Sequence, residues 1–173
     1  LEALQLASAR LPDLVDTLMA QGVKMRFAMD LLAALNGRLM SKAYEMVVPA
    51  DQQRACLMVM GSEGRGEQIL KTDQDNGLIL GEHQQWSGCD QDMQRFTRTL
   101  LSLGYPHCPG NVMVSNPQWT GPVSRWQQRV QDWAGDPGGK GLLNLTILTD
   151  AHAVAGDPGL LESVRDTLFS RCS

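Results

Sequence analysis

The sequence predicts an α/β (α+β) domain with a small mixed sheet, preceded by a pair of N-terminal helices. Three observations support this. Apolar residues recur at helical spacing before residue 49, short apolar runs at 55–60, 77–80 and 142–148 predict buried strands, and helical segments that end at glycine separate them. Strands that alternate with helices are typical of this class. We therefore expect an N-terminal helical segment over 1–48 and a core domain over 49–173.

Two helices are predicted before the core. The first has Pro12 in an early turn, an apolar stripe behind it, and Gly22 where it ends. The second stops before Pro49. Their predicted buried stripes are Leu11, Leu14, Val15 and Leu18 in the first helix, and Phe27, Leu31, Leu32, Leu35, Leu39 and Met46 in the second. Both stripes are interpreted as packing surfaces, so the pair is expected to lead into the α/β core.

Three further helices are predicted later in the chain. One covers 90–103 and ends at Gly104, one covers 121–134, and one follows the turn at 157–159 and runs to Phe169. Trp126 and Trp133 lie seven residues apart and share a helix face. A core contact is favoured for this pair over stacking on a nucleobase.

Composition excludes several classes of protein. The 173 residues carry a net charge of −4 and a pI near 5.3, with no basic stripe, which argues against a nucleic-acid backbone as the main partner. No apolar run is long enough to span a bilayer, and no signal-peptide pattern opens the chain, so we expect a cytoplasmic protein. The chain starts at Leu1, and we expect it to be part of something longer.

The four cysteines point to reduced thiols. They are scattered without a C-x-x-C pair, and Cys56 falls inside a predicted buried strand. A zinc site can be imagined from His83, Cys89, His107 and Cys108, but their spacing matches no standard site. We therefore expect no structural zinc.

The acidic pair Asp73 and Asp75 precedes the predicted strand 77–80. In an extended segment, residues two apart project to the same side, so the two carboxylates would converge. Paired hard oxygen ligands suit Mg²⁺, or Mn²⁺, which completes its coordination with water and substrate phosphates. The alternative is an acidic turn that caps the strand, because Asp, Asn and Gly are common turn formers.

A glycine-rich segment precedes this pair. Gly61 and Ser62 end the predicted strand 55–60, and backbone N–H groups at such a turn form an anion site. Arg65 adds a planar fork of donors that matches a phosphate. The P-loop pattern fails because Gly66 is followed by Glu67, and the glycine order also excludes the dinucleotide fingerprint. A metal-bound nucleoside triphosphate is the ligand that these features favour.

These residues resemble a known family. Gly61-Ser62, ten further residues and then Asp73-x-Asp75 are similar to the signature of the DNA polymerase β-like nucleotidyltransferase superfamily. The fuller string G-S-E-G-R-G-E…T-D-Q-D resembles the N-terminal domain of bacterial PII-protein uridylyltransferases. It resembles still more closely the DUF294 nucleotidyltransferases, which usually accompany CBS or cyclic-nucleotide-binding domains. The resemblance extends to 108–119 and 148–157, and thus over most of the chain.

The resemblance implies a site and a reaction. Asp150 would be the third carboxylate beside Asp73 and Asp75, delivered by a strand over 142–148, and the three would act as metal ligands and catalytic residues. Gly61, Ser62 and Arg65 would hold the triphosphate. A hydroxyl, on an acceptor that is expected to be a protein, would attack the α-phosphate, and pyrophosphate would leave.

Three positions qualify that expectation. His152 stands where the related sequences tend to have arginine, which would weaken the grip on phosphate. Glu67 is assigned to an exposed helix face rather than to the metal's outer shell, and Lys71 to solvent. The alternative function is therefore a nucleotide-sensing or protein-interaction module whose chemistry has lapsed. A helical scaffold without nucleotide affinity is the third hypothesis.

Overall fold

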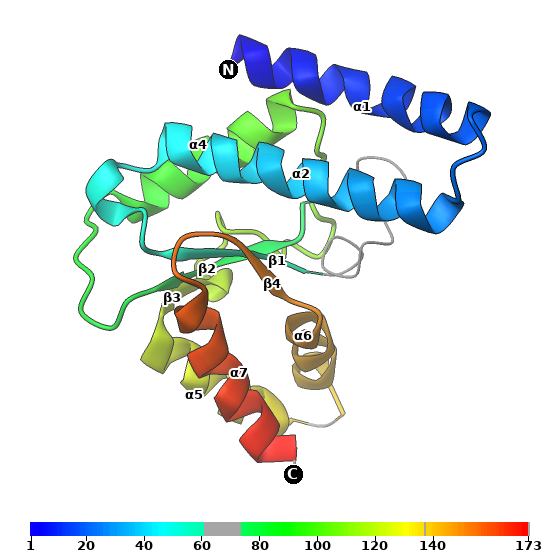
Figure 1. Ribbon diagram of the computed structural model, residues 1–173. Helices are drawn as coiled ribbons and strands as arrows, with labels where there is room; N and C mark the ends of the chain where they lie inside the picture. Colours follow the sequence, from blue (N-terminus) through cyan, green and yellow to red (C-terminus); the bar gives the residue numbers. More distant parts are fainter. Residues whose placement is uncertain (61–73, 137, 173) are drawn as a thin grey trace.

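A four-stranded mixed sheet lies between two layers of helices in the computed structural model, which describes residues 1–60, 74–136 and 138–172, with side chains to Ser170 (Figure 1). The strands are β1 (Cys56–Val59), β2 (Asn76–Leu80), β3 (Thr120–Pro122) and β4 (His152–Ala155). Their order is β3-β2-β1-β4. β1 pairs antiparallel with β2 and β4, and β2 pairs parallel with β3. The predicted fold class is confirmed.

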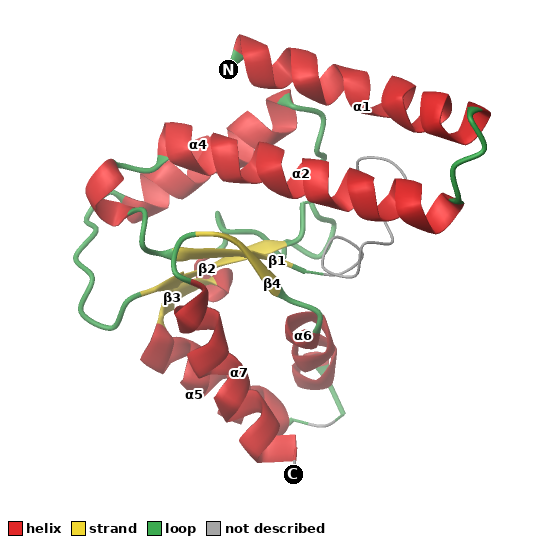
Figure 2. Cartoon of the chain, in the orientation of Figure 1, coloured by secondary structure: helices red, strands yellow, loops and turns green. Residues whose placement is uncertain are grey.

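One layer holds the helices α1 (Glu2–Ala20), α2 (Met25–Val47) and α4 (Cys89–Ser102), with α2 and α4 against the sheet and α1 outermost (Figure 2). The core of this layer joins side chains from α2, α4 and the strands, among them Tyr44, Leu57, Leu78 and Phe96. The short 3-10 helix η1 (Ala50–Gln52) connects α2 to β1. A separate cluster holds α1 on α2 through Leu11, Val15, Leu32 and Leu39.

The other layer holds α5 (Val123–Ala134), α6 (Lys140–Thr149) and α7 (Pro158–Cys172), with the 3-10 helix η2 (Pro117–Trp119) before β3. Its core contains Trp119, Trp126 and Trp133, whose ring centroids lie 5.4–6.4 Å apart. The Trp126 Nε1–H donates to the Leu78 carbonyl at 3.0 Å, which ties α5 to β2. The predicted core role of Trp126 and Trp133 is confirmed.

The two N-terminal helices occur where the sequence predicts them, but both assigned stripes are partly wrong, since Leu14 of α1 is 37% exposed. Phe27 is 62% exposed and Met46 is 49% exposed. The buried positions of α2 include Ala28, Met29 and Ala43 instead. The reason is that α2 packs against α1 on one side and against α4 and β4 on another. Its buried surface is therefore wide and includes small residues that an apolar stripe does not reveal.

The predicted strand over 142–148 is wrong, because these residues belong to α6. The run is rich in Leu, a good helix former, and Thr146 and Thr149 donate their hydroxyls to carbonyls one turn earlier. Periodicity cannot distinguish a short apolar run in a strand from one in a helix. The strand follows as His152–Ala155, whose small residues carry little β-propensity.

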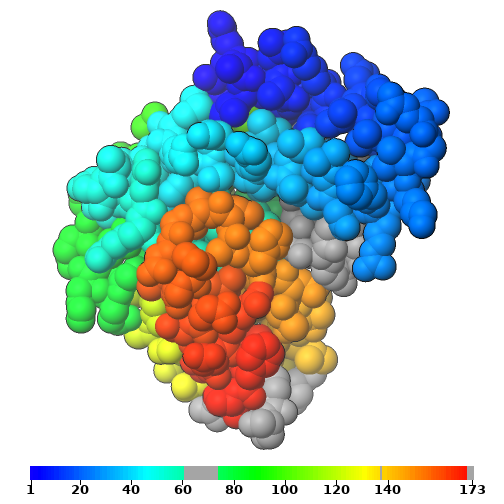
Figure 3. Space-filling model, viewed as in Figure 1, coloured from blue at the N-terminus to red at the C-terminus, as the bar shows by residue number. Residues whose placement is uncertain are grey.

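Figure 3 shows the outer surface of these layers, with the N-terminal helices at one end of the molecule and α7 at the other. Among the described residues, no helix combines the length and the apolar character needed to cross a bilayer.

Candidate active site at one end of the sheet

Strand register brings three chain segments to one end of the sheet. Val59, the last residue of β1, lies opposite Asn76 on one side and opposite His152 on the other. The pairing with β2 extends one residue further, because the Met60 N–H donates to the Asp75 carbonyl at 2.9 Å. Adjacent strands are about 4.8 Å apart, so the backbones of β2 and β4 flank β1 at roughly 10 Å from each other. Asp75 and Asp150 precede these two flanking strands at the same end.

Asp75 is half-buried between two fully buried neighbours, Gln74 and Asn76. The Gln74 Nε2 donates to the carbonyls of Thr97 at 3.2 Å and Tyr105 at 3.1 Å. The Asn76 Oδ1 accepts from the Val114 N–H at 2.8 Å. Since side chains alternate along an extended segment, these anchors turn away from the side that Asp75 takes. The side chains of Gln74, Asp75 and Asn76 therefore project to alternate sides of the segment. The D-x-D pattern requires this alternation if its two carboxylates are to share one side.

The backbone around Asp75 is fixed in the same way. The Gln74 N–H donates to the Pro106 carbonyl at 2.8 Å, and the Asn76 N–H donates to the Val112 carbonyl at 3.0 Å. The segment before β2 is thus held to the loop 105–114 by main-chain and side-chain bonds together. A carboxylate on a rigid segment keeps its position without being ordered by a ligand.

The Cys108 thiol contacts the Asp75 carboxylate. Burial raises the pKa of Cys108 above its usual value, and its hydrogen bond to Asp75 raises that pKa further. A thiol donates in such a pair and the carboxylate accepts, so a thiolate here would meet like charge. The contact places the 108–110 turn beside Asp75.

Asp150 reaches this end of the sheet from a helix and not from a strand. It is the C-terminal cap of α6, with its N–H donating to the Ile147 carbonyl at 3.2 Å, and it is half-exposed. Ala151, which is buried, follows it, and His152 then begins β4 opposite Val59. Asp150 therefore precedes β4 at the end of the sheet where Asp75 precedes β2, but it is carried by a helix and not by the predicted strand, and its role beside Asp75 stays a prediction.

The other predicted site residues lie outside the described residues. These are Asp73, Gly61, Ser62 and Arg65, together with Glu67 and Lys71. The described part of this segment ends at Met60, which pairs with Asp75 at the end of β1. The three-carboxylate set and the triphosphate-binding turn stay predictions.

Within the described residues, no three His, Cys, Asp or Glu side chains are grouped so that they could hold a metal ion. This covers the imagined zinc set His83, Cys89, His107 and Cys108, which the structure does not bring together. Cys56, Cys89 and Cys108 are free thiols. Burial raises the pKa of Cys56 and of Cys89 to about 12, so both are inert thiols of the core.

Sequence reasoning missed Gln74, Asn76 and Cys108 as parts of this site. Gln74 and Asn76 stand between and after acidic residues, where polar side chains are typical of an exposed turn. The apolar strand that follows could have indicated their burial. Asn76 stands two positions before the buried Leu78, so the two side chains lie on the same face of the strand. Nothing in the local pattern indicated that Cys108 meets Asp75, because that contact depends on the fold of the 105–114 loop.

Comparison with known families gives one match. The family model described as "Putative nucleotidyltransferase DUF294" matches residues 9–140. The matched range includes the Gly61–Asp75 segment and ends before Asp150. No curated protein matches the chain.

Proposed function

The chain belongs to the DUF294 family of nucleotidyltransferases, and from this premise we propose that it transfers a nucleoside monophosphate from a nucleoside triphosphate to a hydroxyl acceptor in a metal-dependent reaction. Asp73, Asp75 and Asp150 would hold Mg²⁺ or Mn²⁺. Gly61, Ser62 and Arg65 would hold the triphosphate. The bound metal would supply Lewis-acid stabilisation of phosphate charge and a lower pKa for the attacking hydroxyl.

The residues of the chain have separable tasks in this proposal. Asp75, fixed by its anchored neighbours Gln74 and Asn76, would hold the metal ion through its carboxylate oxygens, and the metal would bind the triphosphate. Asp150 would approach from the other side of β1 and help to accept the proton of the attacking hydroxyl. The N–H groups after β1 would compensate charge on the phosphates. Pyrophosphate leaves as the new phosphoester bond forms.

The observation that carries the proposal is the position of Val59 between Asn76 and His152. This register supports the proposal because Asp75 and Asp150 precede the two strands that flank β1, at the same end of the sheet. The donors there are carboxylate oxygens, which suit Mg²⁺ and Mn²⁺. This arrangement and the family membership support the same chemistry from independent directions.

We infer that the acceptor hydroxyl belongs to a protein in a signalling pathway, and that CBS or cyclic-nucleotide-binding domains regulate the reaction. The acidic net charge of −4 disfavours an extended nucleic-acid acceptor. We also infer a cytoplasmic location, where nucleoside triphosphates and Mg²⁺ are abundant.

The test is nucleotide binding and turnover with ATP, UTP, GTP and CTP, each with Mg²⁺ or Mn²⁺. Binding is followed by thermal shift and turnover by pyrophosphate release in the presence of cell extract as a source of acceptor. We expect one nucleotide to stabilise the protein, and Asp75→Asn to remove both signals. The matched control is Asp166→Asn, which changes an exposed aspartate of α7. Absence of any nucleotide-dependent shift in the wild-type protein would overturn the proposal.

A second candidate function is nucleotide sensing without turnover, and His152 favours it. This residue begins β4 beside the end of β1, at a position where the family resemblance leads us to expect arginine. Imidazole offers phosphate fewer donors than guanidinium does. Nucleotide binding without pyrophosphate release would identify the sensor, and a gain of turnover in His152→Arg would show that this position decides between the two functions.

A further inference from the structure

A cavity of about 210 Å³ opens between α4 and the loop that follows it, on residues that the proposed nucleotidyl transfer does not use. Its lining is Gln94, Thr97, Arg98, His107 and Ser115. No acidic side chain lines it among the described residues. Four of the five lining side chains can donate hydrogen bonds at any pH, and the fifth is an imidazole.

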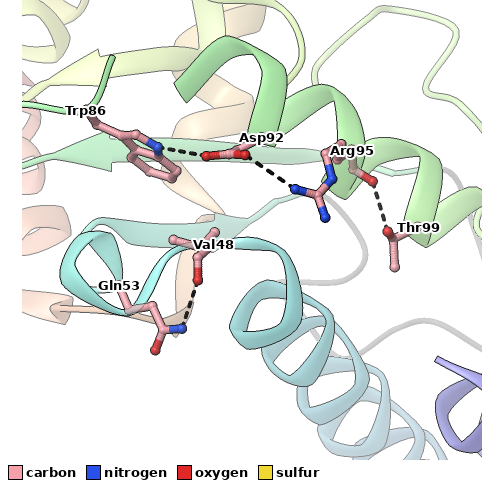
Figure 4. Close-up of polar contacts among 6 residues, drawn as sticks. All are labelled: Val48, Gln53, Trp86, Asp92, Arg95 and Thr99. Carbon is pink, nitrogen blue, oxygen red and sulfur yellow. Dashed lines mark hydrogen bonds and ion pairs between the residues drawn. The ribbon is translucent and has the colours of Figure 1, made fainter. Parts of the chain in front are cut away.

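Arg98 is the charged group of this cavity and is available to a ligand. Arg95, three residues earlier on α4, is paired with Asp92, with its Nη1 3.7 Å from the Asp92 Oδ1 (Figure 4). Asp92 also accepts from the Trp86 Nε1–H at 2.9 Å, so its carboxylate already interacts with both Trp86 and Arg95. Arg98 makes no ion pair with any residue in the described part of the chain and is exposed. An unpaired guanidinium beside neutral donors attracts an anion.

Thr97 provides an independent indication. Its side chain is 3% exposed, and its Oγ1 has no hydrogen-bond partner among the described residues. Buried hydroxyls normally have a partner, and helical threonines commonly bond to a carbonyl one turn earlier. The hydroxyl has almost no accessible surface, so a rotation of the side chain about χ1 would be needed before a ligand in the cavity that Thr97 lines could bond to it.

We propose that the cavity formed by Gln94, Thr97, Arg98, His107 and Ser115 is a binding site for a small anion with a carboxylate or phosphate group. Its volume lies below the roughly 300–1,000 Å³ of pockets for larger ligands, which restricts it to a small molecule or ion. None of its lining residues is a residue to which the proposed function assigns a role. It is nevertheless close to Asp75, because His107 lies between Pro106, which accepts from Gln74, and Cys108, which contacts Asp75.

The test is calorimetric titration of the 173-residue chain with inorganic phosphate and, separately, with acetate, at low ionic strength and without metal or nucleotide. We expect saturable binding of at least one anion. Arg98→Ala should weaken it by about tenfold or more, as expected for the loss of a charge-assisted hydrogen bond. The matched control Arg26→Ala removes an exposed arginine of α2 and should leave the affinity unchanged. The absence of saturable binding, or an equal loss in both variants, would overturn the proposal.

A second variant separates ligand binding from folding. Thr97→Val keeps the side-chain shape and removes a hydroxyl without a protein partner, so the free protein should keep its stability while anion affinity falls. An unchanged affinity would contradict the role of Thr97. Repeating the phosphate titration with a metal–nucleotide complex present decides whether the sites are separate. Direct displacement of phosphate by nucleotide would place the anion in the triphosphate site and refute this inference, while phosphate binding in a protein that binds no nucleotide would refute only the proposed function.

Discussion

At the residue scale, the fold holds the backbone of Asp75 in a fixed position. Its neighbours Gln74 and Asn76 are buried and bonded to the loop 105–114, so its backbone is fixed from both sides. Its side chain meets the Cys108 thiol. The position of this group is therefore a property of the folded chain and does not depend on a ligand.

The reactivity of Cys108 tests the contact with Asp75. Burial and, after it, the neighbouring carboxylate raise the pKa of Cys108, so at mildly alkaline pH the reactive thiolate is scarce. Asp75→Asn removes the negative charge, lowers that pKa and should increase the rate of alkylation by iodoacetamide severalfold. Mass spectrometry of the Cys108 peptide measures the rate. Cys56 and Cys89, whose pKa values are raised to about 12 by burial, should stay unmodified until the protein unfolds.

The control for this prediction is Asp166→Asn, which removes an equal charge from an exposed site. It should leave Cys108 alkylation unchanged. If the two variants react alike, or if Asp75→Asn slows the reaction, Cys108 does not donate to this carboxylate.

Gln74 is predicted to contribute strongly to stability despite its position between two acidic residues. Gln74→Ala removes both side-chain hydrogen bonds and leaves the buried Tyr105 carbonyl without this donor. The expected loss is about 1–3 kcal/mol in the free energy of unfolding. Urea unfolding measures it. Gln91→Ala, at an exposed position of α4, should change stability by less than about 0.5 kcal/mol, and an equal effect of both variants would refute the anchoring role.

At the element scale, the site depends on how closely β4 approaches β1. Gly156 follows β4 with φ +79°, and a Cβ placed there would clash with the Ala55 carbonyl oxygen. The Asp157 N–H then donates to the Arg54 carbonyl at 2.9 Å. The chain after β4 is therefore pressed against the start of β1, and the pairing shifts register between Leu57 and Met58 before His152 aligns with Val59.

Comparing alanine substitutions at two glycines with the same φ distinguishes the stability cost of a steric clash from that of the backbone conformation. Gly22 also has φ +79°, but a Cβ there would meet no atom within 4 Å. Gly22→Ala should cost about 1–2 kcal/mol, the conformational penalty alone. Gly156→Ala should cost about 1–3 kcal/mol more, because the backbone of β1 must shift. Thermal unfolding of both variants measures the difference, and equal losses would contradict the close approach of β4.

The sequence predicts long elements better than short ones. The helices up to α5 lie close to their predicted positions because their apolar spacing continues over several turns and they end at Gly or before Pro. β3 was missed, since Thr120, Gly121 and Pro122 form a strand only as an edge partner of β2. β4 was missed because His-Ala-Val-Ala has little strand character, while the Leu-rich run before it forms α6. The roles of Asp75 and Asp150 stay predictions, and their surroundings depend on contacts made across the fold.

At the scale of the whole molecule, the N-terminal segment shares a core with the sheet. Met40, Ala43, Tyr44 and Val47 of α2 are buried in one cluster with residues of β1, β2 and α4. The Tyr44 hydroxyl donates to the Ala55 carbonyl at 2.6 Å, just before β1. The Tyr105 hydroxyl donates to Asn36 of α2, and the Tyr105 carbonyl accepts from Gln74. Tyr105 therefore connects α2 to the segment that contains Asp75.

We predict from this shared core that residues 1–48 unfold together with residues 49–173. Far-UV circular dichroism reports strongly on α1 and α2, which contain 19 and 23 residues. Tryptophan fluorescence reports on residues 49–173 alone, because the sequence contains no tryptophan before Trp86. The two signals should give the same midpoint in urea, as a cooperative transition requires. A helix signal that falls before the fluorescence changes would identify an N-terminal segment that unfolds on its own.

Tyr44→Phe tests the link itself. The substitution removes the hydroxyl that bonds to the Ala55 carbonyl inside the core, and should lower the free energy of unfolding by about 1–3 kcal/mol. Because the bond joins α2 to the chain entering β1, both spectroscopic midpoints should fall by the same amount. Met46→Ala, at a position of the same helix that is 49% exposed, should leave both nearly unchanged. If Tyr44→Phe lowers only the helix signal, α2 is attached to the sheet without being part of its cooperative core.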